Sequence, residues 1–508
     1  MNTAIIEPFS DAKPWIGNRV TVLIPARQYV INCAWIKERP LPAVELFSCR
    51  LLLAFDKLLP SELRDFFGLN DRECEVLIDS LQEKRLAALN HDGFLIPSSL
   101  LLNQAKKNDG TPILVTYEEQ TERVVFDILA LSVRKEQTLN PSMFGLPELP
   151  IPEDLKKRGT KEIIDAFGSQ FRSYLEISRT QEYERKRTQL YKIMGCQSEN
   201  MLQIPVDIEF TYQANTYGEP KKWTSSYERL NRSQHRPLSN ELESHIADYL
   251  GCKQVSESGL DAEEYCRLVD DTVLSQFASG YNLDYSAWLR ARHQKKTGYK
   301  TSDTTALFGP VYLNENRQTV LKWIHQGLSD VEKESEVHAL WLASEIPLWG
   351  ASAEPLSSFI KDLVELLTKH TRSSHVAMLH HGSNNDDAWA FQNRFKEKIP
   401  YGIMIPNSLD KMEILLIPGI FGLVQYHGQP NSDSTITVPL GYMTQNPERL
   451  KRLEDIVSSR MGSVDQVSIS WPRNYPVADL VPTNWLNPIL STELPSSKQA
   501  RPILSLKK

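Results

Sequence analysis

The segment from Leu59 to Pro97 constrains the fold more than any other part of this chain of 508 residues. Pro60 suits the first turn of a short helix, and Gly68 suits the left-handed residue that ends one. Asn70 and Glu73 form a capping box, which predicts the start of a second helix. That helix carries one apolar stripe with the i, i+3, i+4, i+7 spacing of a buried face, namely Cys74, Leu77, Ile78 and Leu81.

The residues on either side complete a recognisable pattern. Two short apolar runs, 86–89 and 94–96, flank an Asp92-Gly93 turn and predict a β-hairpin. An apolar helix over 43–53 precedes them. Residues 43–97 therefore resemble the winged-helix family. This resemblance implies that the second helix of the pair lies in the DNA major groove while the hairpin contacts phosphates.

The charge of the expected recognition helix, residues 70–84, leaves its partner open. The helix has five carboxylates against Arg72 and Lys84, so its surface has the wrong sign for a polyanion. Arg85 and His91 near the hairpin offset this only in part. Two interpretations remain: the segment binds DNA with the help of Arg72 and Arg85, or it docks a protein.

Composition excludes several classes of protein. The chain is 41% hydrophobic and 24% charged, as is typical of a soluble protein, and its net charge of −7 argues against an extensive nucleic-acid coat. The N-terminus has no basic segment before an apolar run, and the longest apolar stretch, 414–426, is too short to cross a bilayer. The six cysteines are scattered without any C-x-x-C pair. We expect a cytoplasmic protein with no membrane segment, metal or cofactor.

The distribution of prolines and apolar runs predicts a multidomain protein of the α+β or α/β class. The expected parts, in order, are an arm with a winged helix and a hairpin over 1–139, a Pro-rich linker over 140–160, a mainly helical domain over 161–334, an α/β domain over 335–470 and a Pro-rich tail over 471–508.

Short strands are also expected inside these parts. In the arm they are 20–24 and 29–31, and the hairpin consists of 113–117 and 124–128, split by the polar run 118–123. In the helical domain, a polar helix over 161–193 is expected to precede one strand over 206–212, and residues 235–330 to be mostly helical.

The α/β domain alternates strands and helices before a strand pair. The expected elements are a helix from 354 carrying Phe359 and Leu363, a strand over 376–380, a helix carrying Trp389 and Phe395, strands over 401–405, 412–417, 421–426 and 438–443, and a helix over 447–461. This order resembles one half of a phospholipase D-like domain, over about 110 residues (roughly 354–461).

The catalytic residues of that family do not carry over. By position, its histidine falls on Lys411, its lysine on Glu413, its aspartate on Pro418 and its Gly-Ser step on Gln425-Tyr426. The family uses a histidine nucleophile and a lysine that stabilises the oxyanion, and a carboxylate at the lysine position repels a phosphate. The resemblance therefore implies a catalytically inactive domain.

Two other clusters are candidate sites. His380 and His381 end a strand, and Asp386 and Asp387 follow at the start of a helix, where an open α/β sheet binds ligands. Adjacent strand residues face opposite ways, however, so the two histidines cannot share one metal, and Asp386 and Asp387 suit a helix cap. These four residues are weak candidates for a nuclease or phosphodiesterase site.

The second cluster is a basic run bracketed by aromatic residues. Its cations suit phosphate contacts and its rings suit base stacking, although a solvated helix end explains the same pattern. The expected nucleic-acid-binding residues are Trp288, Arg290, Arg292, Lys295, Lys296, Tyr299 and Lys300, together with Arg72 and Arg85.

Three functions are consistent with these patterns. The first is a non-enzymatic, DNA-associated adaptor, because the pairing of a winged helix with an inactive phospholipase D-like domain resembles components of bacterial genome-defence and mobile-element systems. That resemblance implies partners among other subunits, such as a helicase or an ATPase. The second is a metal-dependent nuclease or phosphodiesterase. The third is a protein–protein scaffold without nucleic-acid contact.

Overall fold

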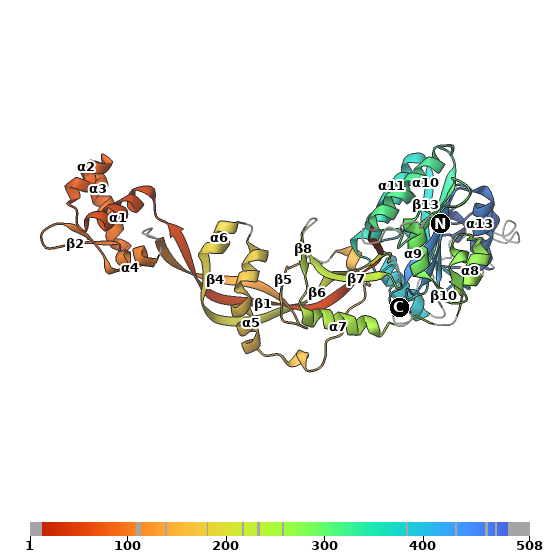
Figure 1. Cartoon of the computed structure of the whole chain (residues 1–508), viewed down its shortest axis with the longest axis horizontal. Helices are drawn as coiled ribbons and strands as arrows, with labels where there is room; N and C mark the ends of the chain where they lie inside the picture. The colour runs from red at the N-terminus through yellow and green to blue at the C-terminus, as the bar shows by residue number, and fades with distance from the viewer. Residues whose placement is uncertain are drawn as a thin grey trace, which may run out of the picture. The chain divides into compact units, whose positions relative to one another are not determined.

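The computed structural model describes residues 13–107, 113–137, 140–179, 181–215, 218–230, 234–253, 255–256, 259–382, 385–431, 434–462, 466–472 and 475–485. They form a mixed α+β protein (Figure 1). The chain divides into two compact units, which are described separately. The large unit comprises Met1–Pro25, Gln137–Pro150 and Gln203–Lys508, and the small unit comprises Ala26–Glu136 and Ile151–Leu202. Most of the expected Pro-rich tail, from residue 486 on, lies outside the described residues.

Part of the small unit is a helical module, defined as residues 41–107. It contains α1 (Ala43–Phe55), α2 (Pro60–Phe67), α3 (Asp71–Glu83), the hairpin β2 (Ala87–Leu89) and β3 (Leu95–Pro97), and α4 (Ser99–Lys107). Gly68 ends α2 in the left-handed conformation, with φ of 67°. The Asn70 side chain accepts a hydrogen bond from the Glu73 N–H at 2.9 Å and caps α3.

The module has its own apolar core. The stripe expected on α3 is buried, with Leu81 fully inaccessible and Leu77 7% exposed. It packs against α1, α2, the hairpin and α4. The three helices, the hairpin and the buried stripe expected from the sequence are therefore present.

The rest of the small unit is a sheet covered by a helix. Strand β1 (Trp15–Pro40) pairs antiparallel with β4 (Ile113–Asp127), from Ala26 opposite Asp127 to Pro40 opposite Ile113, and β4 pairs with β5 (Val133–Arg134). Helix α5 (Thr160–Ser178) packs Phe167 and Phe171 against this sheet, and α6 (Glu182–Arg187) leads into β6 (Thr188–Gln213). Figure 1 shows α5 beside β1 and β4.

The sequence-based prediction was wrong about these strands. Strand β1 is one strand of 26 residues rather than an arm with two short strands, and β4 is continuous through the polar run 118–123 instead of turning there. Partners outside the run explain the difference: Glu118 pairs with Lys37 at 2.5 Å, and Glu122 accepts hydrogen bonds from Tyr174 and from Arg179. Likewise, β6 begins at Thr188, inside the segment expected to be helical.

The large unit contains an eight-stranded mixed sheet with the order β11-β17-β16-β15-β12-β13-β14-β18. Strands β12, β13 and β14 are parallel, whereas β11, β15, β16 and β17 pair antiparallel. The bounds are β11 (Thr304–Phe308), β12 (Glu336–Leu342), β13 (Ser373–His381), β14 (Tyr401–Ile405), β15 (Met412–Ile417), β16 (Phe421–Gly428), β17 (Val438–Thr444) and β18 (Ser468–Trp471).

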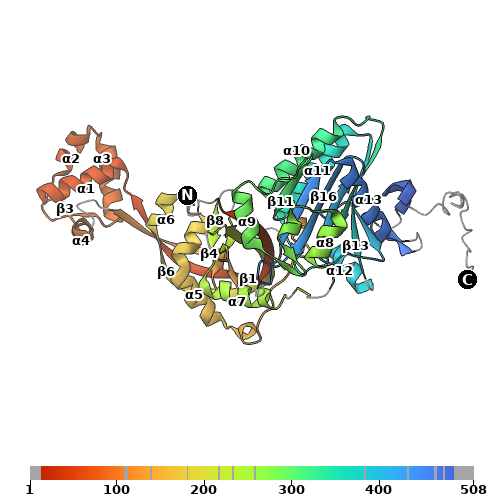
Figure 2. The ribbon, with the colours of Figure 1, turned by 45° about the vertical axis from the view of Figure 1, so that its right-hand side comes forward.

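Helices cover both faces of this sheet (Figure 2). Helices α10 (Asn314–Leu328) and α11 (Glu354–His370) pack on the face that carries Trp341 and Leu423. Helix α13 (Pro447–Met461) packs on the opposite face, where Leu450 and Leu453 approach Gly422. Helix α12 (Asn385–Phe395) lies between β13 and β14 in sequence. The expected alternation over 354–461 is present, and the final helix has the expected bounds, 447–461.

The remaining elements of the large unit precede the sheet in sequence. They are β7 (Lys221–Arg229), β8 (His235–Pro237), α7 (Asn240–Gly251), α8 (Ala262–Val269), β9 (Ala278–Ser279), β10 (Asn282–Leu283) and α9 (Tyr285–His293). Strand β7 pairs with β6 between Val206 and Gln213.

The two units differ from the domain limits expected from the sequence. Strand β11 and helix α10 precede residue 335, yet they belong to the sheet and core of the large unit. Part of the expected linker is packed as well: the Leu23 N–H donates to the Pro147 carbonyl at 2.8 Å, and Met143 and Leu146 pack against Leu23. Composition alone predicts that this Pro-rich segment is an unpacked linker. Its backbone hydrogen bonds to β1 instead make it part of the large unit.

Candidate functional site

Helix α3, the expected recognition helix, presents mainly carboxylates to solvent. Between Asp71 and Glu83 it has five acidic residues and a single cation, Arg72. Arg72 is exposed, and so is Arg85, which adopts a left-handed conformation (φ 55°) at the turn into β2. Both predicted residues are thus accessible, but the helix between them has the sign that repels phosphates.

The other cations beside α3 are already paired with carboxylates. The Arg64 guanidinium lies 2.8 Å from Asp71 and 3.0 Å from Asp65. The Lys84 ammonium lies 2.5 Å from the carboxylate of Glu45, which is only 8% exposed. Since these cations neutralise neighbouring carboxylates, they do not form a phosphate-binding surface.

The helical module also exposes an unusual amount of apolar surface. Nine of the 17 large apolar side chains that are exposed among the described residues belong to it. Phe55, Phe66 and Val76 are each 63% exposed, and Phe47 is 49% exposed. A concentration of this kind on one small module is typical of a surface that contacts another macromolecule.

Four of the apolar side chains of α1 lie on one face of the helix. Val44, Phe47, Leu51 and Phe55 recur at i, i+3, i+7 and i+11; Leu51 is partly buried against the core, and the other three side chains are exposed. We call these four residues the α1 stripe. The sequence predicts only an apolar helix over 43–53, although the spacing of these residues indicates a second apolar face.

The basic run lies on α9 and the turn after it, in the large unit. Trp288 is 1% exposed and stacks on Phe308 with ring centroids 5.4 Å apart. Arg292 donates to the Ala306 carbonyl at 2.9 Å and lies over the Trp288 ring, and burial lowers the pKa of its guanidinium. These positions do not fit the predicted roles, because Trp288 cannot reach a base and Arg292 is engaged with β11.

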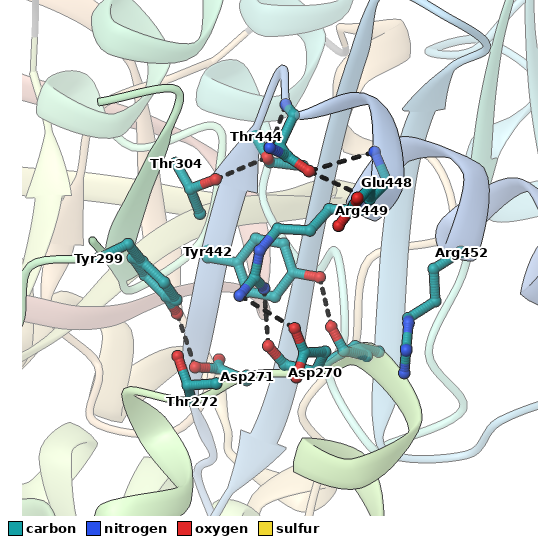
Figure 3. Close-up of polar contacts among 12 residues, drawn as sticks. Asp270, Asp271, Thr272, Tyr299, Thr304, Tyr442, Thr444, Glu448, Arg449 and Arg452 are labelled. Atoms are coloured by element: carbon teal, nitrogen blue, oxygen red, sulfur yellow. Dashed lines mark hydrogen bonds and ion pairs between the residues drawn. The ribbon is translucent and has the colours of Figure 1, made fainter. Parts of the chain in front are cut away.

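Tyr299 belongs to a polar network on the same side of the large unit (Figure 3). Its hydroxyl donates to the buried Asp271 carboxylate at 2.6 Å, and burial raises the pKa of that carboxyl. The Arg449 guanidinium lies over the rings of Tyr299 and Tyr442, at 5.2 and 4.8 Å, and pairs with Asp270. Tyr299 therefore holds the loop after α8 against β17 and α13, which does not fit base stacking.

The remaining members of the basic run differ in accessibility. Arg290 donates to the Gly218 carbonyl at 3.3 Å. Lys295, Lys296 and Lys300 are exposed, and no ion pair joins them to a carboxylate within the described part of the chain. Of the predicted aromatic and basic cluster, these three lysines remain as a candidate phosphate-contacting group.

The two histidines at the end of β13 point to opposite faces, as expected. His380 is fully buried between Phe391 and Trp471, its Nε2 lies 2.8 Å from the Ser470 hydroxyl, and burial lowers its pKa to about 4. His381 Nδ1 lies 2.9 Å from the Glu345 carboxylate. The structure therefore separates the two rings instead of joining them in one site.

The carboxylates expected to assist these histidines do not complete a metal centre. Asp386 is exposed on α12, and the side chain of Asp387 lies outside the described residues. Across the described residues, no group of three or more His, Cys, Asp or Glu side chains is placed to hold a metal ion. The same part of the chain contains no helix with the length and hydropathy needed to span a membrane.

The positions that the phospholipase D-like resemblance singles out lie on the β15–β16 hairpin and directly before it. Lys411 and Glu413 are 6% and 2% exposed. The Glu413 carboxylate accepts a hydrogen bond from Trp349 Nε1 and lies 3.1 Å from His427 Nε2. Glu413 is thus held by this chain's own side chains, in a position where the family would carry a cation facing phosphate.

Comparison with known proteins adds little to this geometry. Neither the scan against protein-family models nor the search of curated proteins gives a match. Among solved structures, the chain is similar to TrmBL2, an archaeal chromatin protein whose structure shows a novel mode of DNA binding. The identity is 8%, the match covers 82% of this chain and 92% of that chain, and the TM-score is 0.20. At so low a TM-score, the likeness supports no inference about this chain.

Proposed function

We propose that this protein is a non-enzymatic adaptor that docks a partner protein through its helical module. The observation that carries the proposal is the exposure of Val44, Phe47 and Phe55 of the α1 stripe, together with that of Phe66 and Val76, on a module whose α3 face is acidic. Exposed aromatic and aliphatic side chains cost solvation free energy unless a partner covers them. The module therefore has an exposed apolar surface that a partner protein can cover.

Charge narrows the kind of partner. The carboxylates of α3 disfavour the DNA backbone and favour a protein surface that combines basic and apolar side chains. The three helices and hairpin of the module have the element order of a winged helix, and the proposal uses that scaffold for protein docking. By the resemblance of the domain pairing, we place the partner among the subunits of a bacterial defence or mobile-element assembly, a helicase or ATPase being the expected kind.

A second candidate function is weak, sequence-independent contact with DNA. Lys295, Lys296 and Lys300 favour it, because they are exposed within six positions of one another. Three lysines neutralise at most three phosphates, so the logarithm of affinity should fall with the logarithm of salt with a slope of about −2 to −3. Such contact would add DNA association to the adaptor role.

The docking proposal is tested by native-level expression of the full chain with an affinity tag. We expect one stoichiometric partner to co-purify with the unmodified chain and to be lost from the Phe47→Ser/Phe55→Ser variant. Tyr117→Ser is the matched control, since Tyr117 is 65% exposed and lies outside the module. A partner that is retained by the Phe47/Phe55 variant, or lost equally from the control, contradicts docking through the α1 stripe.

The DNA candidate is tested by fluorescence anisotropy with a labelled duplex over a range of salt concentrations. Reversal of Lys295, Lys296 and Lys300 to Glu should abolish binding uniformly across sequences, because phosphate contacts carry no base information. Arg72→Glu is the comparison on α3. Loss of affinity in Arg72→Glu with none in the triple reversal would instead assign DNA contact to the winged-helix scaffold.

A further inference from the structure

The large unit contains a hollow that none of the functions above uses. Its volume is about 1110 Å³, which is ample for a metabolite-sized ligand. It opens between the start of β15, the end of β16 and the β9–β10 hairpin. The side chains that matter below are Tyr281, Lys411 and His427, and the lining also includes Leu283, Tyr426 and Asn431.

His427 lines this hollow, and its side chain is almost fully buried. The residue is 4% exposed, and its Nε2 lies 3.1 Å from the buried carboxylate of Glu413. Neither ring nitrogen forms a hydrogen bond among the described residues, although Nε2 lies within ion-pair distance of Glu413. A buried polar atom without a hydrogen-bond partner costs free energy, so the imidazole of a residue that lines a hollow is a candidate for a hydrogen bond to a ligand.

Glu413 lies beside that histidine. Trp349 Nε1 donates to the same carboxylate oxygen that faces His427. The carboxylate is therefore held between an indole and an imidazole, both supplied by the large unit. The carboxylate and the imidazole lie within ion-pair distance, so Glu413 is placed to set the tautomer of the His427 ring. In that role Glu413 is a positioning residue for His427.

A cation and an aromatic ring also line the hollow, and they are in contact with each other. The Lys411 ammonium is 4.7 Å from the centroid of the Tyr281 ring, and the lysine is 6% exposed. Tyr281 is 51% exposed, while its hydroxyl is anchored by donation to the Gly259 carbonyl at 2.9 Å. An ammonium suits a phosphate or carboxylate, and an anchored, accessible ring suits stacking on a planar group.

We propose that this hollow binds a small anion that carries a planar ring, with a mononucleotide as the representative ligand. Lys411 contacts the anionic group, Tyr281 stacks on the ring, and the His427 imidazole forms a hydrogen bond to a polar group of the ligand. The site lies in the large unit and does not depend on docking by the helical module.

The test is isothermal titration calorimetry of the full chain with AMP, with ATP and with inorganic phosphate. We expect one of the two nucleotides to bind at least tenfold more tightly than phosphate, because phosphate lacks the stacking contact. Lys411→Met should weaken nucleotide binding about tenfold or more, as expected for a hydrogen bond to a charged group. Lys296→Met, an exposed lysine outside the hollow, is the matched control and should bind as the unmodified chain does.

Tyr281→Ala is a second test in case the variants of the buried residues fold poorly. The Tyr281 ring is half exposed, so its removal should affect folding little. It should weaken nucleotide binding about fivefold or more while leaving phosphate binding unchanged. His427→Gln should weaken nucleotide binding in a chain whose thermal unfolding is unaltered. Absence of nucleotide binding, equal affinity for phosphate, or unchanged affinity in both Lys411→Met and Tyr281→Ala would overturn the proposal.

Discussion

The helical module and the eight-stranded sheet use the same apolar residue types for different ends. Every residue of β15, β16 and β17 is buried, because helices cover both faces of the sheet. On α1, by contrast, Phe47 and Phe55 are exposed, although the module has a buried apolar core of its own. A small module buries a smaller fraction of its surface than a large one. Its small size does not explain, however, why the exposed residues include phenylalanines. The difference shows that apolar surface stabilises the fold in the sheet and is available for binding in the module.

The largest effect expected from this comparison is in the sheet core. Trp341→Ala removes a fully buried indole that packs against Trp349 and Phe359, and it should lower the free energy of unfolding of the large unit by about 3–5 kcal/mol. Denaturant unfolding with hydrogen exchange resolved by segment measures this. Protection should fall in residues 304–471 and stay unchanged in the module; an equal fall in both would show that the two regions unfold as one.

The matching truncation in the module should have a local effect. Leu77→Ala on α3 should cost about 2–5 kcal/mol, because the side chain is 93% inaccessible in the module core. The same hydrogen-exchange experiment should show lost protection over 43–97 and full protection over the sheet. Unchanged protection of α3 would mean that Leu77 does not belong to the core assigned to it.

The free energy of unfolding of the large unit, which contains the sheet, should also depend on pH. Burial lowers the pKa of His380 from its ordinary value of 6.5 to about 4, so the folded chain favours the neutral ring and the unfolded chain binds the proton more readily. The stability is therefore complete above pH 6.5 and is lost as pH falls through 4, by about 3–4 kcal/mol in total.

The measurement compares the free energies of unfolding at pH 7.5 and pH 4.5 in the unmodified chain and in His380→Phe. The variant keeps a ring between Phe391 and Trp471 but cannot titrate, so its stability should fall less at acid pH. An identical fall in both proteins would place the acid sensitivity in another group.

The smallest stability effect belongs to the α1 stripe, where the effect on binding should be largest. Phe47→Ala should change the free energy of unfolding by no more than about 0.5 kcal/mol, since the ring is half exposed and surface substitutions rarely cost more. Thermal unfolding beside the co-purification experiment separates the two effects. A large loss of stability would show that Phe47 supports the module itself and would remove it from the docking surface.

How far the sequence predicts each region depends on the range of the interactions. Asn70, Gly68 and the α3 stripe act within a few residues, and the helices of the module are where they place them. The long strands failed because Glu122 is stabilised by Tyr174 and Arg179, more than 50 positions away. From the sequence alone, polar residues inside a strand predict a turn, because the distant residues that pair with them are not known.

The candidate sites show the same limit. A run of cations and aromatic residues predicts nucleic-acid contact only while its side chains are accessible, and Trp288 is covered by Phe308 from a strand 20 positions later. The pairing of Glu413 with His427 also depends on β15 and β16 lying side by side. The α1 stripe was different, because its spacing was visible in the sequence and only its exposure needed the structure.

The long separation between β1 and its partners has a consequence for how the protein is made. The Asn18 side chain donates to the Thr437 carbonyl, 419 positions later, and the Ala353 N–H donates to Thr21, 332 positions earlier. During synthesis, the beginning of β1 therefore leaves the ribosome long before these partners exist. The neighbouring strands β4 and β6 are complete by residue 213, but the Thr21 N–H has no acceptor until the Ala351 carbonyl is translated, and other chains can pair with such an incomplete edge. We expect the nascent protein to need protection by a chaperone, and its yield to improve when translation is slowed.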